Sequence, residues 1–200
     1  METQFKTNRF DLALAAALMV SLGIDAALTW HLLRGGGRPA ADARQEQRLE
    51  SGAQLPPLDV RTLGGSAQQL KPAAGKGLLL YVLSPACGWC DRNVANVKAL
   101  AAAVTAQGHY DWAGVSLSPK GLAEHLNDND FGFPVFVAAD NPSARTYKLA
   151  STPNTLVIAP DGRLEAQYLG ACTAATGAAI EERFGLRLPG LNPSQATARN

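Results

Sequence analysis

The chain has 200 residues, of which 46% are hydrophobic, and its 18 basic and 17 acidic residues leave a formal net charge of +1. A nearly neutral chain without a basic stripe is poorly suited to binding nucleic acid, so no nucleic-acid partner is expected. Three cysteines are too few for a disulfide-built scaffold, so the fold must depend on a hydrophobic core.

Residues 12–33 form an almost continuous apolar stretch near the N-terminus. As a helix, this stretch would reach about 30 Å, the thickness of a bilayer's hydrocarbon core. Asp25 interrupts it, and a carboxylate near the bilayer centre costs about 3 kcal/mol on insertion scales. We expect residues 1–33 to be an uncleaved single-span anchor. The alternative is a cleaved signal peptide, with Lys6 and Arg9 as its basic region.

Residues 34–54 are polar, begin with glycine and proline, and are predicted to be a linker. Basic residues lie on both sides of the apolar stretch, so charge alone does not decide on which side of a membrane the rest lies. Residues 189–200 lack any periodicity and are expected to form a loose tail. The globular domain is therefore expected at residues 55–188.

Strand-like and helix-like patterns alternate through this domain, which predicts an α/β fold with one central mixed sheet flanked by helices. A short hairpin is expected near the start, with Gly64-Gly65 as its turn. The other expected strands span residues 77–83, 110–116, 133–138, 154–159 and 163–169, and the expected helices span residues 90–107, 119–126, 142–149 and 173–184.

Cys87 and Cys90 stand three residues apart, between the expected strand at residues 77–83 and the helix that follows it. Unpaired N–H groups and the dipole at the start of a helix favour negative charge, so Cys87 is predicted to be a nucleophile with a lowered pKa. Cys90 lies further into the helix and is predicted to resolve the mixed disulfide. Gly88 permits a tight turn, and Trp89 adds a flat apolar surface beside the sulfurs.

Other interpretations of this pair are a structural disulfide, half of a zinc site, or chance. A zinc site would need a second cysteine pair or a histidine pair at ligand spacing, and His31, His109 and His125 are scattered along the chain. No metal and no cofactor are therefore expected, and redox chemistry is the favoured interpretation. Cys172 is expected to be a half-buried apolar residue rather than a third redox thiol.

Pro153 directly precedes the expected strand at residues 154–159. A cis Thr152–Pro153 bond would fit such a position, but cis is a minority state for bonds before proline. The residues alone therefore favour an ordinary trans proline at a strand start.

Residues 55–188 resemble a thioredoxin-fold protein and, within that fold, the membrane-anchored TlpA/ResA-like thiol-disulfide oxidoreductases of bacteria. The resemblance implies that Pro153 is a cis-proline packed against the active-site sulfurs, and that Thr152 offers backbone hydrogen bonds to an extended substrate segment. The residues that carry the resemblance are the Leu55-Pro56 opening, the Gly64-Gly65 turn, the strand into Cys87-Gly-Trp-Cys90, Thr152-Pro153 with its strand, and the Pro160-Asp161-Gly162 turn.

The resemblance also implies a location and partners. The anchor would cross the bacterial inner membrane once, with its N-terminus inside and the thioredoxin-like domain in the periplasm. The substrates would be thiols or disulfides of exported proteins, and a membrane protein of the DsbD type would supply electrons.

Three positions depart from the usual pattern. Ala86 replaces the tryptophan that commonly precedes the first cysteine, Tyr81 replaces a buried acid, and Asn93 stands near the place of a glutamate. The adjacent carboxylate, Asp91, is expected to be solvated. An aromatic residue before the second cysteine and a threonine before the proline are also similar to DsbC-type isomerases.

The expected function is a membrane-tethered extracytoplasmic thiol-disulfide oxidoreductase, more reductase-like than oxidase-like. Two alternatives stay open. One is a redox-inert thioredoxin-fold module that binds or assembles partners in an envelope complex, which the altered residues favour. The other is a protein resembling the disulfide isomerases.

Overall fold

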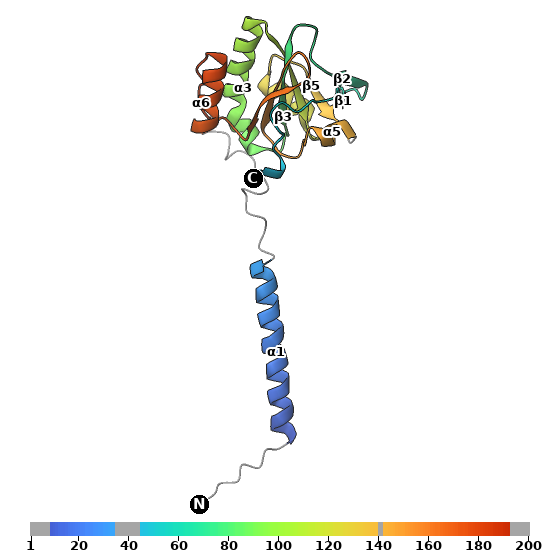
Figure 1. Ribbon diagram of the computed structural model, residues 1–200, viewed down its shortest axis with the longest axis vertical. Coiled ribbons are helices and arrows are strands. Elements are labelled where there is room, and N and C mark those ends of the chain that lie inside the picture. Colours follow the sequence, from blue (N-terminus) through green and yellow to red (C-terminus); the bar gives the residue numbers. More distant parts are fainter. Residues whose placement is uncertain (1–8, 35–44, 140–141, 193–200) are drawn as a thin grey trace, which may run out of the picture. The chain divides into compact units, whose positions relative to one another are not determined.

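The computed structural model describes residues 9–34, 45–139 and 142–192, and the chain divides into two compact units, residues 1–43 and 44–200. The first unit contains one helix, α1 (Arg9–Arg34), drawn in blue in Figure 1. Among the described residues, no helix combines the length and the apolar character that a membrane crossing requires. The predicted anchor at residues 1–33 is therefore not confirmed and stays a prediction.

The described part of the predicted linker, residues 45–54, belongs to the second unit and is hydrogen-bonded to its sheet. The backbone N–H of Leu49 donates to Gln167 Oε1 at 2.8 Å, and Gln167 Nε2 donates to the Gln47 carbonyl at 3.2 Å. Near the C-terminal end of the described chain, the Gly190 N–H donates to Asn96 Oδ1 at 2.9 Å. Residues 35–44 of the predicted linker and residues 193–200 of the predicted tail lie outside the described residues.

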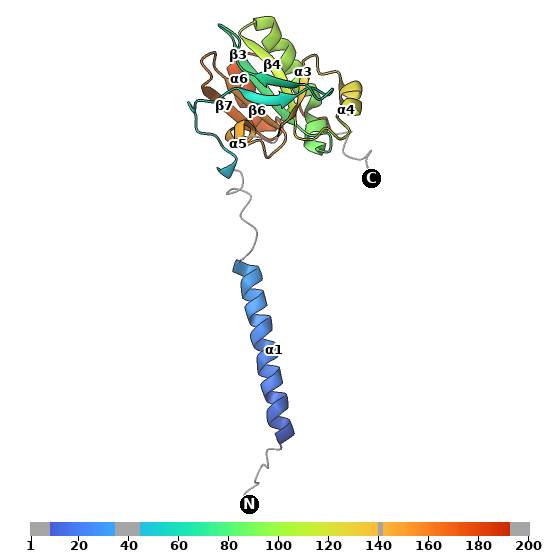
Figure 2. The same cartoon turned by 90° about the vertical axis from the view of Figure 1, so that its right-hand side faces the viewer.

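A mixed sheet of seven strands forms the centre of the second unit (Figure 2). The strands are β1 (Leu58–Arg61), β2 (Ala67–Leu70), β3 (Gly77–Leu83), β4 (Tyr110–Ser116), β5 (Val135–Ala138), β6 (Asn154–Ile158) and β7 (Leu164–Leu169). They lie in the order β2-β1-β5-β4-β3-β6-β7. The pairs β3–β4 and β4–β5 are parallel, whereas β1–β2, β1–β5, β3–β6 and β6–β7 are antiparallel.

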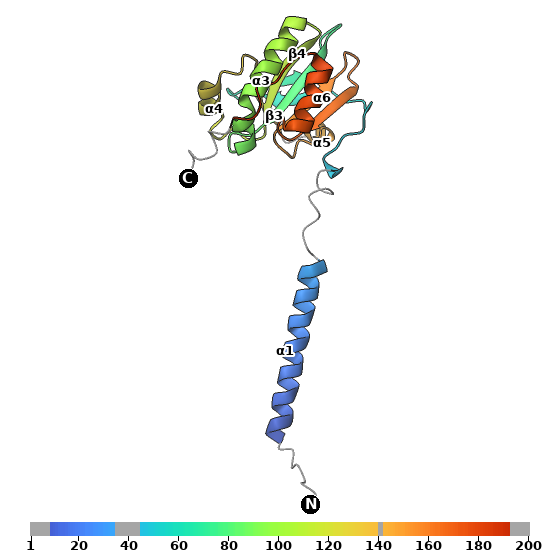
Figure 3. The ribbon, with the colours of Figure 1, turned by 90° about the vertical axis from the view of Figure 1, so that its left-hand side faces the viewer.

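Helices flank the sheet on both faces. Figure 3 shows α3 and α6 together over β3 and β4. Helix α5 instead contacts β1, where the Asp59 N–H donates to Ser143 Oγ at 3.0 Å, and Figure 1 shows the two elements side by side. These helices and α4 have the bounds α3 (Gly88–Gln107), α4 (Leu122–Asn129), α5 (Pro142–Thr146) and α6 (Ala174–Phe184).

Strand β3 is buried along its whole length, so its side chains alternate between two cores. Leu79, Tyr81 and Leu83 belong to the core that α3 and α6 cover. The intervening side chains belong to the opposite core, which also contains Tyr147. This burial on both faces explains why the continuous apolar run of β3 was recognisable in the sequence.

The sequence-based elements agree closely with the structure at the centre of the sheet, and two helices differ. Helix α4 begins at Leu122 rather than Pro119, because Gly121 has a φ of +73° and cannot continue a right-handed helix. Helix α5 ends at Thr146 rather than Leu149, because Lys148 has a φ of +48°.

The close packing around Gly77 at the start of β3 gives a test of the fold. A Cβ at this position would overlap the Tyr110 ring and lie 2.6 Å from the Ile158 carbonyl oxygen. We expect Gly77→Ala to lower the free energy of unfolding by about 1–3 kcal/mol, measured by urea denaturation.

The matched control is Gly64→Ala, because the nearest atom to its added Cβ is Thr62 Oγ1 at 3.7 Å. This variant should unfold within about 0.5 kcal/mol of the wild type. Equal stability of the two variants would contradict the packing described for β3.

Candidate active site

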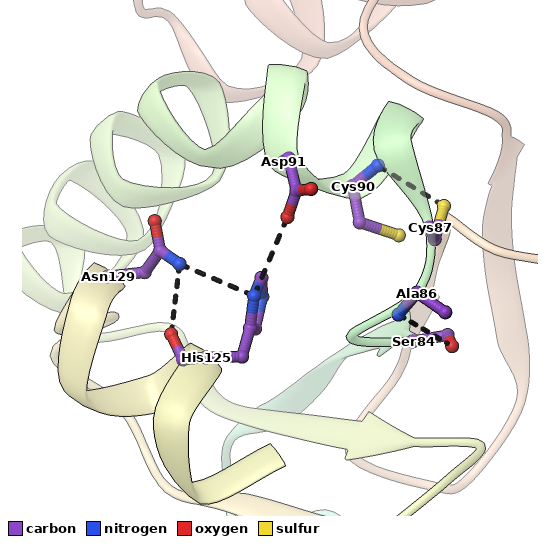
Figure 4. Close-up of polar contacts among 7 residues, drawn as sticks. All are labelled: Ser84, Ala86, Cys87, Cys90, Asp91, His125 and Asn129. Atoms are coloured by element: carbon purple, nitrogen blue, oxygen red, sulfur yellow. Dashed lines mark hydrogen bonds and ion pairs between the residues drawn. The ribbon is translucent and has the colours of Figure 1, made fainter. Parts of the chain in front are cut away.

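Cys87 occupies the N-cap position of α3, at the end of the turn that leaves β3. The turn is closed by a backbone hydrogen bond from the Cys87 N–H to the Ser84 carbonyl at 3.0 Å. The Cys87 sulfur accepts a hydrogen bond from the Cys90 N–H at 3.2 Å, as a capping side chain does (Figure 4). The helix start therefore directs N–H groups at the Cys87 sulfur, as the sequence predicted.

The two cysteines have opposite environments. Hydrogen bonding with the Cys90 thiol lowers the pKa of Cys87 from 9.0 to about 6, and contacts with Thr152 and backbone N–H groups add to the decrease against the effect of partial burial. The hydrogen bond with Cys87, followed by burial, raises the pKa of Cys90 far above that of an ordinary thiol. Cys87 is half-buried, whereas Cys90 is 2% exposed. The pair thus combines an accessible thiolate with a protected thiol.

The loop before β6 lies against this pair. The Thr152–Pro153 bond is cis, and the Cys87 sulfur lies 3.5 Å from the Thr152 carbonyl oxygen. The trans proline favoured by the residues alone is therefore wrong, and the cis bond implied by the resemblance is confirmed. The side chain of Pro153 is buried.

A groove runs beside Cys87, between Trp89 and the loop before β6. Trp89 is 51% exposed, and the Arg92 guanidinium lies 4.4 Å from its ring centroid. The structure therefore brings Trp89, Thr152 and Pro153 together, next to the two cysteines. The residues lining the groove are uncharged: Gln47, Trp89, Ser151, Thr152, Pro153, Leu169, Gly170, Ala171, Thr173 and Thr176.

The third cysteine packs against the same core as the active-site pair. Cys172 is half-buried, and burial raises its pKa to about 11. Its backbone N–H donates to Asn93 Oδ1 at 3.0 Å, and this bond joins α3 to the loop before α6. The high pKa leaves Cys172 protonated at neutral pH, in agreement with its expected role as an apolar residue rather than a nucleophile.

Asp91 does not lie in solvent as expected. It is 9% exposed, and its Oδ1 lies 3.5 Å from Nδ1 of the buried His125 on α4 (Figure 4). Asn129 Nδ2 also donates to the His125 carbonyl at 2.9 Å. Sequence reasoning missed this pair, because the two residues come from distant segments. The signal in the sequence was the spacing of Leu122 and His125, which stand three residues apart and so share one face of a helix.

Within the described residues, no group of three or more histidine, cysteine or acidic side chains is arranged to hold a metal ion.

Comparison with solved structures identifies the fold as that of thioredoxin. A protein from Chlorobium tepidum assigned as the thiol:disulfide interchange protein DsbE is 18% identical with a TM-score of 0.59, over 69% of this chain and 98% of that chain. A thiol:disulfide interchange protein from Bacteroides sp. is 16% identical with a TM-score of 0.55, over 69% and 92%. The thioredoxin domain of a thiol-disulfide oxidoreductase from Bacteroides vulgatus is 17% identical with a TM-score of 0.54, over 68% and 99%.

These proteins are similar in fold to this chain at low sequence identity. No protein-family model and no curated protein matches the sequence. Fold and site geometry are therefore the basis for the functional argument.

The asymmetry of the cysteine pair gives a pH-dependent prediction. Only a thiolate reacts with iodoacetamide, so alkylation of Cys87 in the reduced protein should increase with pH around its pKa of about 6. The rate should level off about two pH units higher. Peptide mapping should find Cys90 unmodified under the same conditions, because it is buried and protonated.

The Cys90→Ala variant tests the cause of the low pKa. Because the Cys90 thiol makes the largest contribution, its removal should shift the alkylation midpoint of Cys87 toward the ordinary value of 9.0. Cys172→Ala is the control and should leave that midpoint unchanged. An unchanged midpoint in Cys90→Ala would show that the thiol of Cys90 does not control Cys87.

Proposed function

We propose that this chain is a thiol-disulfide oxidoreductase that exchanges a dithiol for a disulfide through Cys87 and Cys90. The observation that carries the proposal is the pairing of a half-buried Cys87 of low pKa with a buried Cys90 of high pKa. The Thr152 carbonyl beside Cys87 and the uncharged groove support an extended peptide as the substrate. The solved structures similar in fold bear the names of proteins with this chemistry.

The exchange takes two steps. The Cys87 thiolate attacks one sulfur of a substrate disulfide; a Cys87–substrate bond forms, and the other substrate sulfur leaves and takes up a proton. Cys90 then loses its proton and attacks the Cys87 sulfur, which releases the second substrate thiol and leaves a Cys87–Cys90 disulfide. Two electrons pass to the substrate, so another dithiol must reduce the protein again.

The proposed direction is reduction of the substrate. Strong stabilisation of the nucleophilic thiolate favours the reduced pair and makes a protein oxidising, as in DsbA, where this pKa is about 3.5. The pKa of about 6 for Cys87 lies closer to the value of about 7 in thioredoxin. A membrane dithiol donor of the DsbD type is proposed as the source of electrons.

The proposed site of action is the bacterial periplasm, where the substrates are thiols or disulfides of exported proteins. The apolar sequence of residues 12–33 supports a single-span anchor at residues 1–33 in the inner membrane. The proposed arrangement continues with a linker at residues 34–54, the thioredoxin-like domain at residues 55–188 and a tail at residues 189–200.

A second candidate is a redox-inert binding or assembly module. It is favoured by Tyr81, which occupies the buried position of an acid in the resembling proteins. The isomerase-like alternative rests on Trp89 and Thr152 flanking the site. The intact cysteine pair argues against an inert module.

Catalysed reduction of insulin by dithiothreitol tests the proposal. The wild type and Cys172→Ala should both accelerate it, whereas Cys87→Ala and Cys90→Ala should fall to the uncatalysed rate. In cells, Cys90→Ala should accumulate mixed disulfides on Cys87, because the second step is blocked. Absence of both insulin reduction and trapped partners would reject the enzyme and favour the assembly module.

The proposed location has a separate test. An alkaline phosphatase fused to the C-terminus should be active, because that enzyme requires disulfides that form in the periplasm. A matched β-galactosidase fusion should be inactive. The reverse pattern would place the C-terminus in the cytoplasm and contradict the periplasmic location.

A further inference from the structure

Tyr81 carries a buried hydroxyl with no hydrogen-bond partner among the described residues. The residue is 1% exposed, and leaving a buried hydroxyl unsatisfied destabilises the folded state, so its presence calls for a physical explanation. Tyr147 is also 1% exposed, but its hydroxyl donates to the Pro56 carbonyl at 2.8 Å. The isolation of the Tyr81 hydroxyl is therefore not a general property of buried tyrosines in this domain.

The position of Tyr81 places its ring beneath the active site. Tyr81 lies on the β3 face that packs under α3, in the same core as Cys90. Cys87 and Cys172 pack against this core as well. Burial raises the pKa of Tyr81 well above 10.0, and negative charge on Cys90 adds more to this rise than charge on Cys87 or Cys172, whereas the nearby Asn93 side chain opposes it. The phenol therefore stays protonated and keeps an O–H that can donate a hydrogen bond, and among the sulfurs Cys90 influences it most strongly.

The second step of exchange creates a need for such a donor. Cys90 must become a thiolate inside an apolar core, and an ion in such surroundings is unstable without hydrogen bonds. The nearby carboxylate of Asp91 is directed at His125 on α4. The Cys90 N–H is directed at the Cys87 sulfur. The Tyr81 hydroxyl lies in the same core as Cys90 and makes no hydrogen bond of normal geometry with another described residue.

We propose that the Tyr81 hydroxyl donates a hydrogen bond to the Cys90 sulfur as that sulfur becomes a thiolate and resolves the mixed disulfide. This inference rests on the proposed function. The Cys90 proton passes to solvent, the Cys87–Cys90 bond forms as the Cys87–substrate bond breaks, and the leaving substrate sulfur takes up a proton. Tyr81 keeps its own proton throughout, so no further reactant is required.

Oxidised glutathione separates the two steps in the full chain. Reduced protein first forms a mixed disulfide on Cys87 and releases one glutathione, and attack by Cys90 then releases the second. In Tyr81→Phe we expect the second release to slow by about tenfold or more, because a hydrogen bond to a charged group is lost. Its pH profile should move to higher pH, because the Cys90 thiolate becomes harder to form. The first release should be unchanged.

Tyr147→Phe is the matched control, because it removes an equally buried hydroxyl from the opposite core. It should leave both releases unchanged. Tyr81→Phe keeps the buried ring and removes only the hydroxyl, so thermal unfolding should confirm that the variant folds. In the Cys87→Ala background, Tyr81→Phe should also raise the pH at which Cys90 ionises, followed by thiolate absorbance.

Failure of this inference and failure of the proposed function are distinguishable. If the wild type forms no mixed disulfide or never resolves it, the proposed function fails. If the wild type resolves it and Tyr81→Phe does so at the same rate and with the same pH profile, the donor role alone is overturned. Equal slowing of both steps in Tyr81→Phe would also overturn it, because only Cys90 should be affected.

Discussion

The hydrogen bonds received by the Cys87 sulfur at the start of α3 are the interaction on which the site depends. The Cys90 N–H donates to that sulfur at 3.2 Å, and contact with the Cys90 thiol lowers the pKa of Cys87. The same contact raises the pKa of Cys90, so one local geometry produces both a nucleophile and a protected partner. This division requires the helix to begin at Gly88, because a later start would direct its N–H groups away from Cys87.

The order and direction of the strands explain why the loop before β6 lies beside Cys87. Strands β3 and β6 are antiparallel, with Val82 opposite Asn154, so the end of β3 lies beside the start of β6. Cys87 follows β3 closely and Pro153 immediately precedes β6, which brings these distant segments together. The loop after β7 lies against the second of these segments, since the Gly170 N–H donates to the Pro153 carbonyl at 2.8 Å. The groove is therefore a consequence of strand order and direction.

Local sequence patterns were sufficient for the centre of the fold. The apolar run of β3 marks a strand buried on both faces, and α3 ends at Gln107 as predicted, before Gly108 in a left-handed conformation. The burial of Asp91 could not be predicted, because it depends on His125 in a separate helix. The isolation of the Tyr81 hydroxyl also depends on what surrounds it in three dimensions, so the sequence showed only that an acid was absent there.

The central claim is that Cys87 forms the mixed disulfide with the substrate and that Cys90 then resolves this mixed disulfide. It is tested most directly by treating the reduced Cys90→Ala and Cys87→Ala proteins with oxidised glutathione at neutral pH and mapping the products by mass spectrometry. The account predicts rapid formation of a mixed disulfide on Cys87 in the first protein and none on the buried Cys90 in the second. Modification of Cys90 at a rate equal to or above that of Cys87 would contradict it.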